Sequence, residues 1–219
     1  MLDLKPDELL TTTRSVRKRL DFDRPVPRQL IRECLEVAFQ APNGSNMNAW
    51  RWVVVDDPKL VAATAEIYNG GLDDFIATLG GATGENYTGA AVPGAERIAT
   101  SVQHLRDNFH RSPALLVPLL AGRCENLNAF FQASQWGSII QAVWSFFLAL
   151  RARGLGSAWT TGHMWREKQL AELLGIPHQQ FTQVGLFPIA YTLGTDFAPA
   201  YRKPVDEVVG WNQFEAGAP

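Results

Sequence analysis

Cysteine is scarce in this sequence, and its scarcity removes two classes of small domain. Cys34 and Cys124 are the only cysteines among 219 residues, and neither belongs to a C-x-x-C pair. Two isolated thiols cannot form the disulfide framework of a small secreted domain, and their spacing does not match a zinc site. We expect both thiols to be buried and inert, and we predict no metal site.

Long apolar runs and excess positive charge are also lacking. No uninterrupted apolar stretch approaches the length of a membrane span, and the opening MLDLKPDELL carries charges where a signal peptide needs an apolar core. We therefore expect a cytoplasmic protein. The net charge of -2 argues against a nucleic-acid partner, because such partners bind basic surfaces. The length and the 46% hydrophobic content fit one compact α/β or α+β domain.

Familiar catalytic motifs are missing as well. The chain has no H-E-x-x-H and no G-x-S-x-G. Ser15 and Lys18 match S-x-x-K, but the companion motifs of that hydrolase class are absent. Gly154 and Gly156 begin a G-x-G-x-x-G pattern, yet Trp159 occupies its third position and a helix precedes it. Hydrolase, metalloenzyme and Rossmann-type interpretations therefore have no support.

The most informative stretch is residues 37–55, VAFQAPNGSNMNAWRWVVV. Pro42 and Gly44 end an apolar helix, and Trp50 begins a strand. Between them lie four short side chains that can donate or accept hydrogen bonds: Asn43, Ser45, Asn46 and Asn48. Such a loop can bind a flat, heteroatom-rich ligand. An ordinary Asn/Ser/Gly turn is the alternative.

Basic residues gather near the two ends of the chain. Arg14, Ser15 and Arg17 provide two guanidiniums and a hydroxyl within four residues, which suits a phosphate group. A solvated basic turn is the alternative. Arg202 and Lys203 form a second basic pair. We expect the two clusters to meet around one anionic group.

Periodicity predicts the order of the remaining elements. Helices are expected over residues 3–13, 24–40, 59–67, 95–109, 126–153 and 165–174, and strands over 50–55, 113–122 and 182–193. Helix 126–153 is apolar around most of its circumference, which predicts a central helix and a candidate dimer interface, with simple core burial as the alternative. The glycine-rich residues 69–94 are expected to form a lid or a loosely ordered loop. As a lid, this segment would offer Tyr68, Phe75 and Tyr87 to a planar substrate.

Four motifs in this order resemble the nitroreductase family. They are R-S-x-R, the AP-x-x-x-N-x-[QN] loop before a Trp-containing strand, GLGS after a long helix, and R-x-P-x-x-E-V-V-x-W-N at the end. The resemblance implies an α+β fold, with a mostly antiparallel sheet flanked by helices, a long central helix and an intertwined homodimer that binds FMN at its interface. It also implies a single domain over residues 1–219, with 69–94 as a lid-like excursion and 198–219 as a C-terminal arm.

The resemblance assigns roles to residues by position. It places Arg14, Ser15, Arg17 and Arg202 on the FMN phosphate and ribityl chain, and Asn46 on the polar edge of the isoalloxazine. Ser45 and Asn48 are expected to reach the partner chain's flavin. Four residues are expected to lie along the ring: Thr160, Thr161, Gly162 and His163. His163 is a candidate general acid, with capping or packing as the alternative.

The sequence departs from the family pattern at several positions. Arg19 stands where an aromatic residue is usual, Asn48-Ala49 replaces a common Gln-Pro, and Ser145 stands where Asn is frequent. Ala200 replaces a basic residue, and Lys203 is expected to compensate. These changes concern the substrate range more than FMN binding.

The resemblance also implies a reaction. The expected enzyme is an FMN-dependent oxidoreductase in which NADH or NADPH reduces flavin N5 and a nitroaromatic, quinone or enone then takes the electrons in a ping-pong cycle. A deazaflavin donor remains open. The alternatives are a flavin-dependent dehydrogenase or dehalogenase on the same fold, and a flavin-binding protein without turnover.

Overall fold

The computed structural model describes residues 1–78 and 94–214. Its helices are α1 Pro6–Thr12, α2 Arg28–Ala38, α3 Pro58–Thr78, α4 Ala95–Asn108, α5 Ala129–Ala152 and α6 Glu167–Leu174, with 3-10 turns η1 Gly44–Asn46, η2 Phe109–Arg111, η3 Gly162–Arg166 and η4 Val205–Glu207. Its strands are β1 Leu20–Asp21, β2 Trp50–Val55, β3 Ala114–Ala121, β4 Leu155–Gly156, β5 Phe181–Gln183 and β6 Phe187–Thr192. Within these ranges no helix is long and apolar enough to cross a membrane, and no group of side chains has a metal-binding arrangement.

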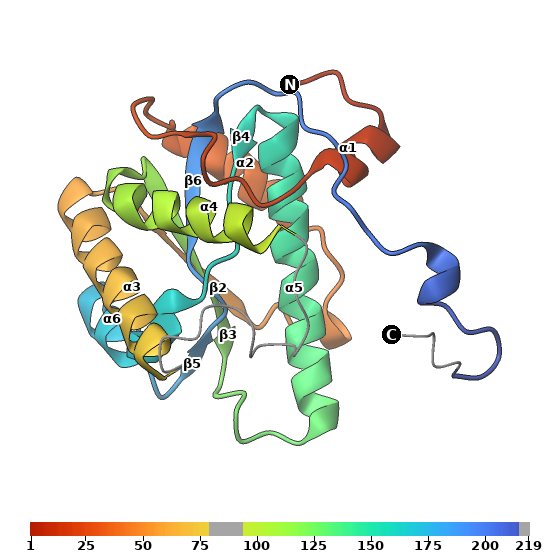
Figure 1. Cartoon of the computed structure of the whole chain (residues 1–219). Helices are drawn as coiled ribbons and strands as arrows, with labels where there is room; N and C mark the ends of the chain where they lie inside the picture. Colours follow the sequence, from red (N-terminus) through yellow and green to blue (C-terminus); the bar gives the residue numbers. More distant parts are fainter. Residues whose placement is uncertain (79–93, 215–219) are drawn as a thin grey trace.

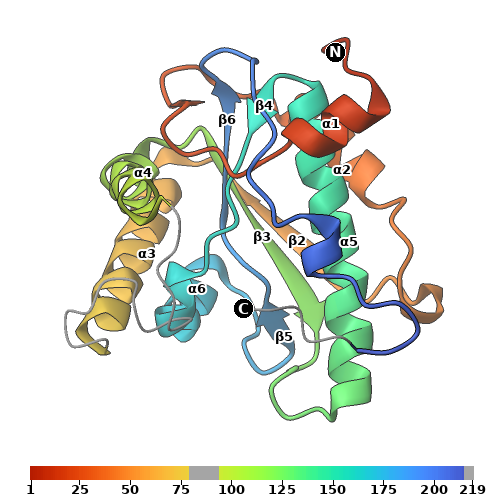
Figure 2. The ribbon, with the colours of Figure 1, turned by 45° about the vertical axis from the view of Figure 1, so that its right-hand side comes forward.

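The six strands form one antiparallel sheet in the order β1-β6-β3-β2, with β4 added to β6 and β5 added to β3. Helices cover both faces of this sheet (Figure 1). Helices α2 and α5 lie on one side, and α3, α4 and α6 lie on the other, as the turned view in Figure 2 also shows. The α+β fold expected from the sequence is confirmed.

Strand β3 explains why the core has two halves. Successive side chains of a strand point to opposite faces, so Leu116 and Leu120 pack against α2 and α5, whereas Leu115 and Val117 pack on the other side. Its first seven residues are buried, as expected for a strand covered on both faces. The apolar run at 113–122 therefore forms the centre of the fold.

Helix α3 is longer than the sequence indicated. The expected helix at 59–67 continues to Thr78, and it includes residues 69–78 of the expected glycine-rich excursion. Gly71 lies inside this helix, where a Cβ would stand 2.1 Å from the Gly162 carbonyl oxygen. Glycine therefore permits a close contact between α3 and η3 that periodicity cannot show. The rest of the expected lid, residues 79–93, lies outside the described residues, as does Tyr87.

The apolar stretch at 182–193 is divided into two strands. β5 pairs with β3, and Val184 then donates to the Pro118 carbonyl while Leu186 donates to the Thr160 carbonyl, both at 3.0 Å. The backbone thus changes its hydrogen-bonding partner between β5 and β6. The two-residue strands β1 and β4 were not expected, because pairs this short carry no period of their own.

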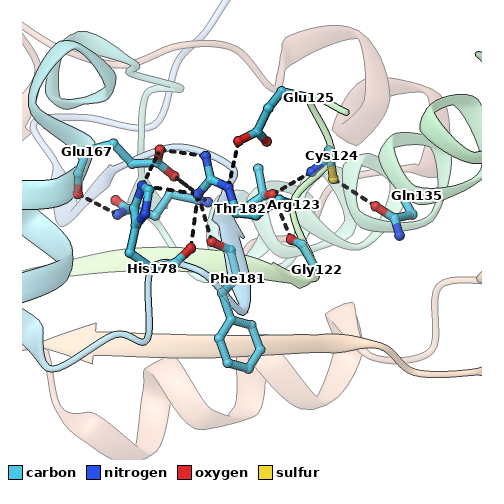
Figure 3. Close-up of polar contacts among 10 residues, drawn as sticks. Gly122, Arg123, Cys124, Glu125, Gln135, Glu167, His178, Phe181 and Thr182 are labelled. Carbon is cyan, nitrogen blue, oxygen red and sulfur yellow. Dashed lines mark hydrogen bonds and ion pairs between the residues drawn. The ribbon is translucent and has the colours of Figure 1, made fainter. Parts of the chain in front are cut away.

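Arg123 joins three elements beyond the end of β3 (Figure 3). Its guanidinium contacts both carboxylate oxygens of Glu167 at 2.8 and 2.9 Å, and it donates to the Phe181 carbonyl at 3.0 Å. Glu125 accepts a further bond from it at 2.8 Å, and His178 lies 3.1 Å from Glu167. The Glu167 and Arg123 side chains are 12% and 18% exposed, so this ion pair is largely screened from water. It fixes α6 against the β5 end of the sheet.

Candidate active site

The N-terminal basic motif lies on an extended segment that is fixed to the body of the protein. The Val16 amide donates to the Ser157 carbonyl at 2.8 Å, and the Val16 side chain is buried against Gly156. A Cβ on Gly156 would meet Val16 Cβ at 3.0 Å, so the GLGS turn allows the segment to pack closely. Anchoring at Val16 fixes where Ser15 and Arg17 are presented.

A cavity of about 990 Å³ brings the two basic clusters together. Arg14, Ser15 and Arg17 line it from the N-terminal segment, and Arg202 lines it from the C-terminal segment. The other charged residues in its wall are Lys18, Arg19, Arg97, Glu96 and Asp196. Positive charge is therefore in excess, which makes this cavity suitable for an anionic group.

Arg17 and Arg202 have guanidinium N–H groups that make no hydrogen bond to the described residues. Arg202 donates to the neighbouring Tyr201 carbonyl at 2.7 Å, and the Arg17 side chain makes no hydrogen bond or ion pair with the described residues. Burial lowers the pKa of Arg17, and the nearby Tyr68 phenol acts in the opposite direction. A partly buried cation without a carboxylate costs free energy, and a phosphate with its forked oxygens would offset that cost. This observation gives the site its chemistry.

The amide loop has an unusual backbone. Ser45, Asn46 and Asn48 have φ angles of 52°, 53° and 51°, in the left-handed region that non-glycine residues seldom occupy. Asn43 holds this conformation: its side-chain oxygen accepts from the Asn48 amide at 2.9 Å, and its side-chain nitrogen donates to Asn48 Oδ1 at 3.2 Å. Such conformations persist where the surroundings enforce them, often at ligand sites.

The amide loop lies apart from the basic cavity within one chain. The Gly44 amide donates to Ser138 Oγ of α5 at 2.8 Å, and none of residues 43–48 lines the cavity. The side chains of Ser45 and Asn46 are exposed and make no hydrogen bond with the described residues. The predicted contacts of Ser45, Asn46 and Asn48 with a flavin therefore stay predictions, and one chain does not bring them to Arg14 and Arg17.

The segment expected along the ring is largely turned inward. Thr160 is buried and its hydroxyl donates to the Leu186 carbonyl, while Gly162 packs against Tyr68 and Leu72 of α3. Thr161 is exposed. The Thr160 hydroxyl and the close packing at Gly162 therefore stabilise the fold. Of these three residues, only Thr161 has an exposed side chain that can contact a ligand.

His163, the candidate general acid, is fully buried. Its side chain is 0% exposed, and neither ring nitrogen has a hydrogen-bond partner within residues 1–78 and 94–214. Burial lowers the pKa of His163 to about 4, and nearby Glu167 raises it less. The imidazole is therefore in its neutral form at neutral pH, and its roles as a general acid or as a packing residue both stay predictions.

Three other expected site residues lie elsewhere. Tyr68 is 3% exposed and its ring stacks on Phe109 with centroids 4.4 Å apart, so its side chain lies in the core, and its contact with a substrate stays a prediction. Burial also raises the pKa of Tyr68 to about 12. Phe75 is half-buried beside Trp165. Lys203 does not line the cavity of its own chain, and its compensation for Ala200 stays a prediction.

Three basic residues of the cavity were not predicted as site residues. Lys18 and Arg19 continue the charge run of the motif, which was a usable signal, but nothing in the sequence linked Arg97 to it. Arg97 reaches the cavity because α4 lies across the N-terminal segment, where Lys18 donates to Thr100 Oγ1 at 3.0 Å. The far wall is therefore set by helix packing.

Comparison with known proteins finds relatives in sequence and in fold. An NADH dehydrogenase from Thermus thermophilus is 28% identical over 209 residues, covering 90% of this chain and 91% of that protein. The FMN- and NADPH-dependent nitroreductase NfnB from Sphigopyxis sp. strain HMH is 20% identical, with a TM-score of 0.67 and coverage of 96% and 100%. Oxidised iodotyrosine deiodinase bound to FMN and 3-iodo-L-tyrosine is 24% identical, with a TM-score of 0.67 and coverage of 94% and 98%. Both solved structures share the fold.

The family model for the nitroreductase family matches residues 10–191. This range runs from the last residues of α1 to β6, so it includes the R-S-x-R motif, the amide loop and the GLGS turn. The chain therefore belongs to the nitroreductase family.

Proposed function

We propose that this protein is an FMN-dependent oxidoreductase whose basic cavity holds the FMN phosphate. The observation that carries the proposal is the meeting of Arg14, Ser15, Arg17 and Arg202 in one cavity, where Arg17 has no carboxylate partner among residues 1–78 and 94–214. Guanidinium and hydroxyl groups match the oxygens of a phosphate monoester. The FMN-bound and FMN-dependent relatives support this choice of cofactor.

When bound, FMN supplies the redox chemistry by accepting a hydride from NADH or NADPH and passing electrons to an electron-poor acceptor. The chain's own groups bind and orient. Arg14, Arg17 and Arg202 hold the phosphate end, and the exposed side chains of Ser45, Asn46 and Thr161 are available to hydrogen-bond the ring. The acceptor class we propose is a nitroaromatic, quinone or enone.

The site is proposed to be completed by a second copy of the chain. The amide loop does not reach its own basic cavity, so a flavin that contacts both needs the loop of a partner. The C-terminal arm extends away from the two helical layers in Figure 1. Its apolar side chains are unusually exposed, as are several on α5: Tyr201, Val208, Trp211, Phe214, Phe130, Phe131, Ile140 and Trp144. Burying them against an identical chain would favour association.

The dimer can be tested by sedimentation of the purified protein with FMN. We expect a dimer for the wild type and dissociation for Trp144→Glu, because a charge on this apolar face loses its hydration on association. Trp165→Glu is the matched control, since Trp165 is 51% exposed but lies on η3 in the opposite layer, compared with 41% for Trp144. A monomeric wild type, or dissociation by the control alone, would contradict the proposal.

The function is tested by the visible spectrum of the purified protein, recorded without oxygen before and after NADH or NADPH is added. We expect flavin bands that bleach with at least one nucleotide and return when a quinone or nitroaromatic is added. Bands that persist with both nucleotides would favour another donor, an oxidised organic substrate or a binding protein without turnover. No bands after incubation with FMN would refute the cofactor assignment.

A further inference from the structure

Arg19 lines the basic cavity, yet its nitrogen atoms are already engaged by the protein. Its Nε donates to the Leu193 carbonyl at 2.8 Å, its Nη1 donates to the Asp196 carbonyl at 3.0 Å, and its Nη2 donates to Asp196 Oδ1 at 2.6 Å. A guanidinium has five N–H donors in a rigid plane, and all three nitrogens of this one are committed to the turn at residues 193–196. Arg19 therefore differs from Arg17, whose side chain makes no hydrogen bond within residues 1–78 and 94–214.

The turn held by Arg19 is the root of the C-terminal arm. The Arg19 guanidinium lies 4.2 Å from the centre of the Phe197 ring, and Arg151, which is 5% exposed, lies 5.0 Å from the same ring. Gly194 has φ of 76°, and a Cβ there would stand 2.6 Å from Arg19 Nη2. The turn therefore combines a glycine conformation, hydrogen bonds to two carbonyls and a cation–π contact.

The same turn leads directly to the phosphate-binding arginine. Arg14 donates to the Ala198 carbonyl at 3.0 Å, and four residues later Arg202 enters the cavity wall. Asp196 is 91% exposed, so its charge alone contributes little, and the rigid hydrogen-bonding fork of Arg19 carries most of the restraint. Without that fork, residues 193–202 would sample more conformations, and Arg202 would be in the cavity for less of the time.

We propose that Arg19 is a positioning residue for the phosphate site: it fixes the 193–198 turn and so delivers Arg202 to the cavity opposite Arg14 and Arg17. This inference rests on the proposed FMN site. An aromatic side chain at this position could stack on Phe197 but could not donate to the Leu193 and Asp196 carbonyls as Arg19 does. Occupancy of the site and anchoring of the arm are then coupled, and each favours the other.

The test compares Arg19→Lys, Arg19→Met and the matched control Arg32→Met in the full-length protein. Arg32 carries the same charge in an exposed ion pair with Glu36 on α2, away from the cavity. Apoprotein is titrated with FMN by flavin fluorescence, and cleavage of the Phe197–Ala198 bond by chymotrypsin is timed by mass spectrometry. Both Arg19 variants should bind FMN about tenfold more weakly, because Arg202 would then occupy the cavity for a smaller fraction of the time. Both should also be cut faster at Phe197, and FMN should slow cleavage of the wild type.

Three results would overturn this inference. Normal FMN affinity in both Arg19 variants would show that the turn does not position the site. Normal affinity in Arg19→Lys with weak binding in Arg19→Met would show that Arg19 acts as a charge, because lysine keeps the charge and loses the fork. Weaker binding without faster cleavage would separate Arg19 from the turn. If the wild-type apoprotein does not bind FMN, the proposed function fails and this inference falls with it.

Discussion

Replacing Arg17 and Arg202 together with methionine is expected to weaken FMN binding at least about hundredfold, because hydrogen bonds to a charged group contribute about 1.5–3 kcal/mol each. Both guanidiniums line the cavity, and neither has a carboxylate partner among the described residues. Equilibrium titration of apoprotein with FMN measures the loss. Riboflavin, which lacks the phosphate, should bind the variant and the wild type about equally.

The same substitution makes a second prediction about the apoprotein. Burial lowers the pKa of Arg17, so its charge is held in the folded state at a cost. Replacing such a charge with an apolar side chain is often neutral or stabilising. We therefore expect the free energy of unfolding of the apoprotein, measured by urea denaturation, to stay the same or rise slightly. A clear loss of stability together with equal losses of FMN and riboflavin would indicate a structural role and contradict the phosphate site.

The control removes equal charge from another surface. Arg28 and Arg32 lie on α2, and Arg28 pairs with Asp56 there. The double change Arg28→Met with Arg32→Met alters the net charge by the same amount, far from Arg17. We expect its FMN affinity to stay close to that of the wild type, since exposed charges are screened beyond about 10 Å at 0.1 M salt. Equal losses in both double variants would mean that net charge, and not this cavity, governs binding.

Glu167→Gln is expected to lower the free energy of unfolding by about 3 kcal/mol, since removing one partner of a largely buried ion pair leaves the other charge uncompensated. Glu167 contacts Arg123, His178 and the Gln183 amide, so one carboxylate joins α6 to β5 (Figure 3). Urea denaturation at pH 7 measures the effect. Glu125→Gln is the control: Glu125 also contacts Arg123, but its side chain is 52% exposed, and its loss should cost less than about 1 kcal/mol.

The effect of Glu167 should depend on pH in one direction. Burial alone would raise the pKa of Glu167, but hydrogen bonds from Arg123, the Gln183 amide and His178 outweigh it, and the pKa lies below its ordinary value of 4.5. A carboxyl with a lowered pKa in the folded state stabilises the protein fully above its unfolded pKa, and this stability is lost as the pH falls through the folded pKa. The difference between wild type and Glu167→Gln should therefore shrink below pH 4.5. A constant difference down to acid unfolding would contradict the ion-pair explanation.

The sequence predicted those helices and strands whose formation depends on neighbouring residues alone. The run at 113–122 became β3, and the apolar helix expected at 126–153 became α5, which begins after Asn128, whose side chain accepts from the Phe131 amide at 3.1 Å. Pro42 and Gly44 correctly predicted the break before β2. These features depend on backbone preference, capping and side-chain period, which neighbouring residues determine.

The sequence did not predict features that depend on contacts between residues far apart in the chain. The glycine-rich sequence from residue 69 predicted the end of a helix, but α3 continues to Thr78, and Gly71 packs there against the Gly162 carbonyl. His163 and Tyr68 have side chains that are common in functional sites, and both are buried in this structure. Burial is a property of the packed molecule, so residue type could not reveal it.

The sequence by itself determined which groups are available: arginines and a serine for an anion, an amide-rich loop, a long apolar helix, and no hydrolytic or metal motif. Only the tertiary structure decided which of them meet. It brought Arg202 to Arg14 and Arg17, committed Arg19 to a turn near residue 196, and kept the amide loop apart from the cavity of its own chain. The physical reason is that hydrogen bonds and ion pairs act over a few ångströms, and only the packing of helices on the sheet sets distances between residues so far apart in sequence.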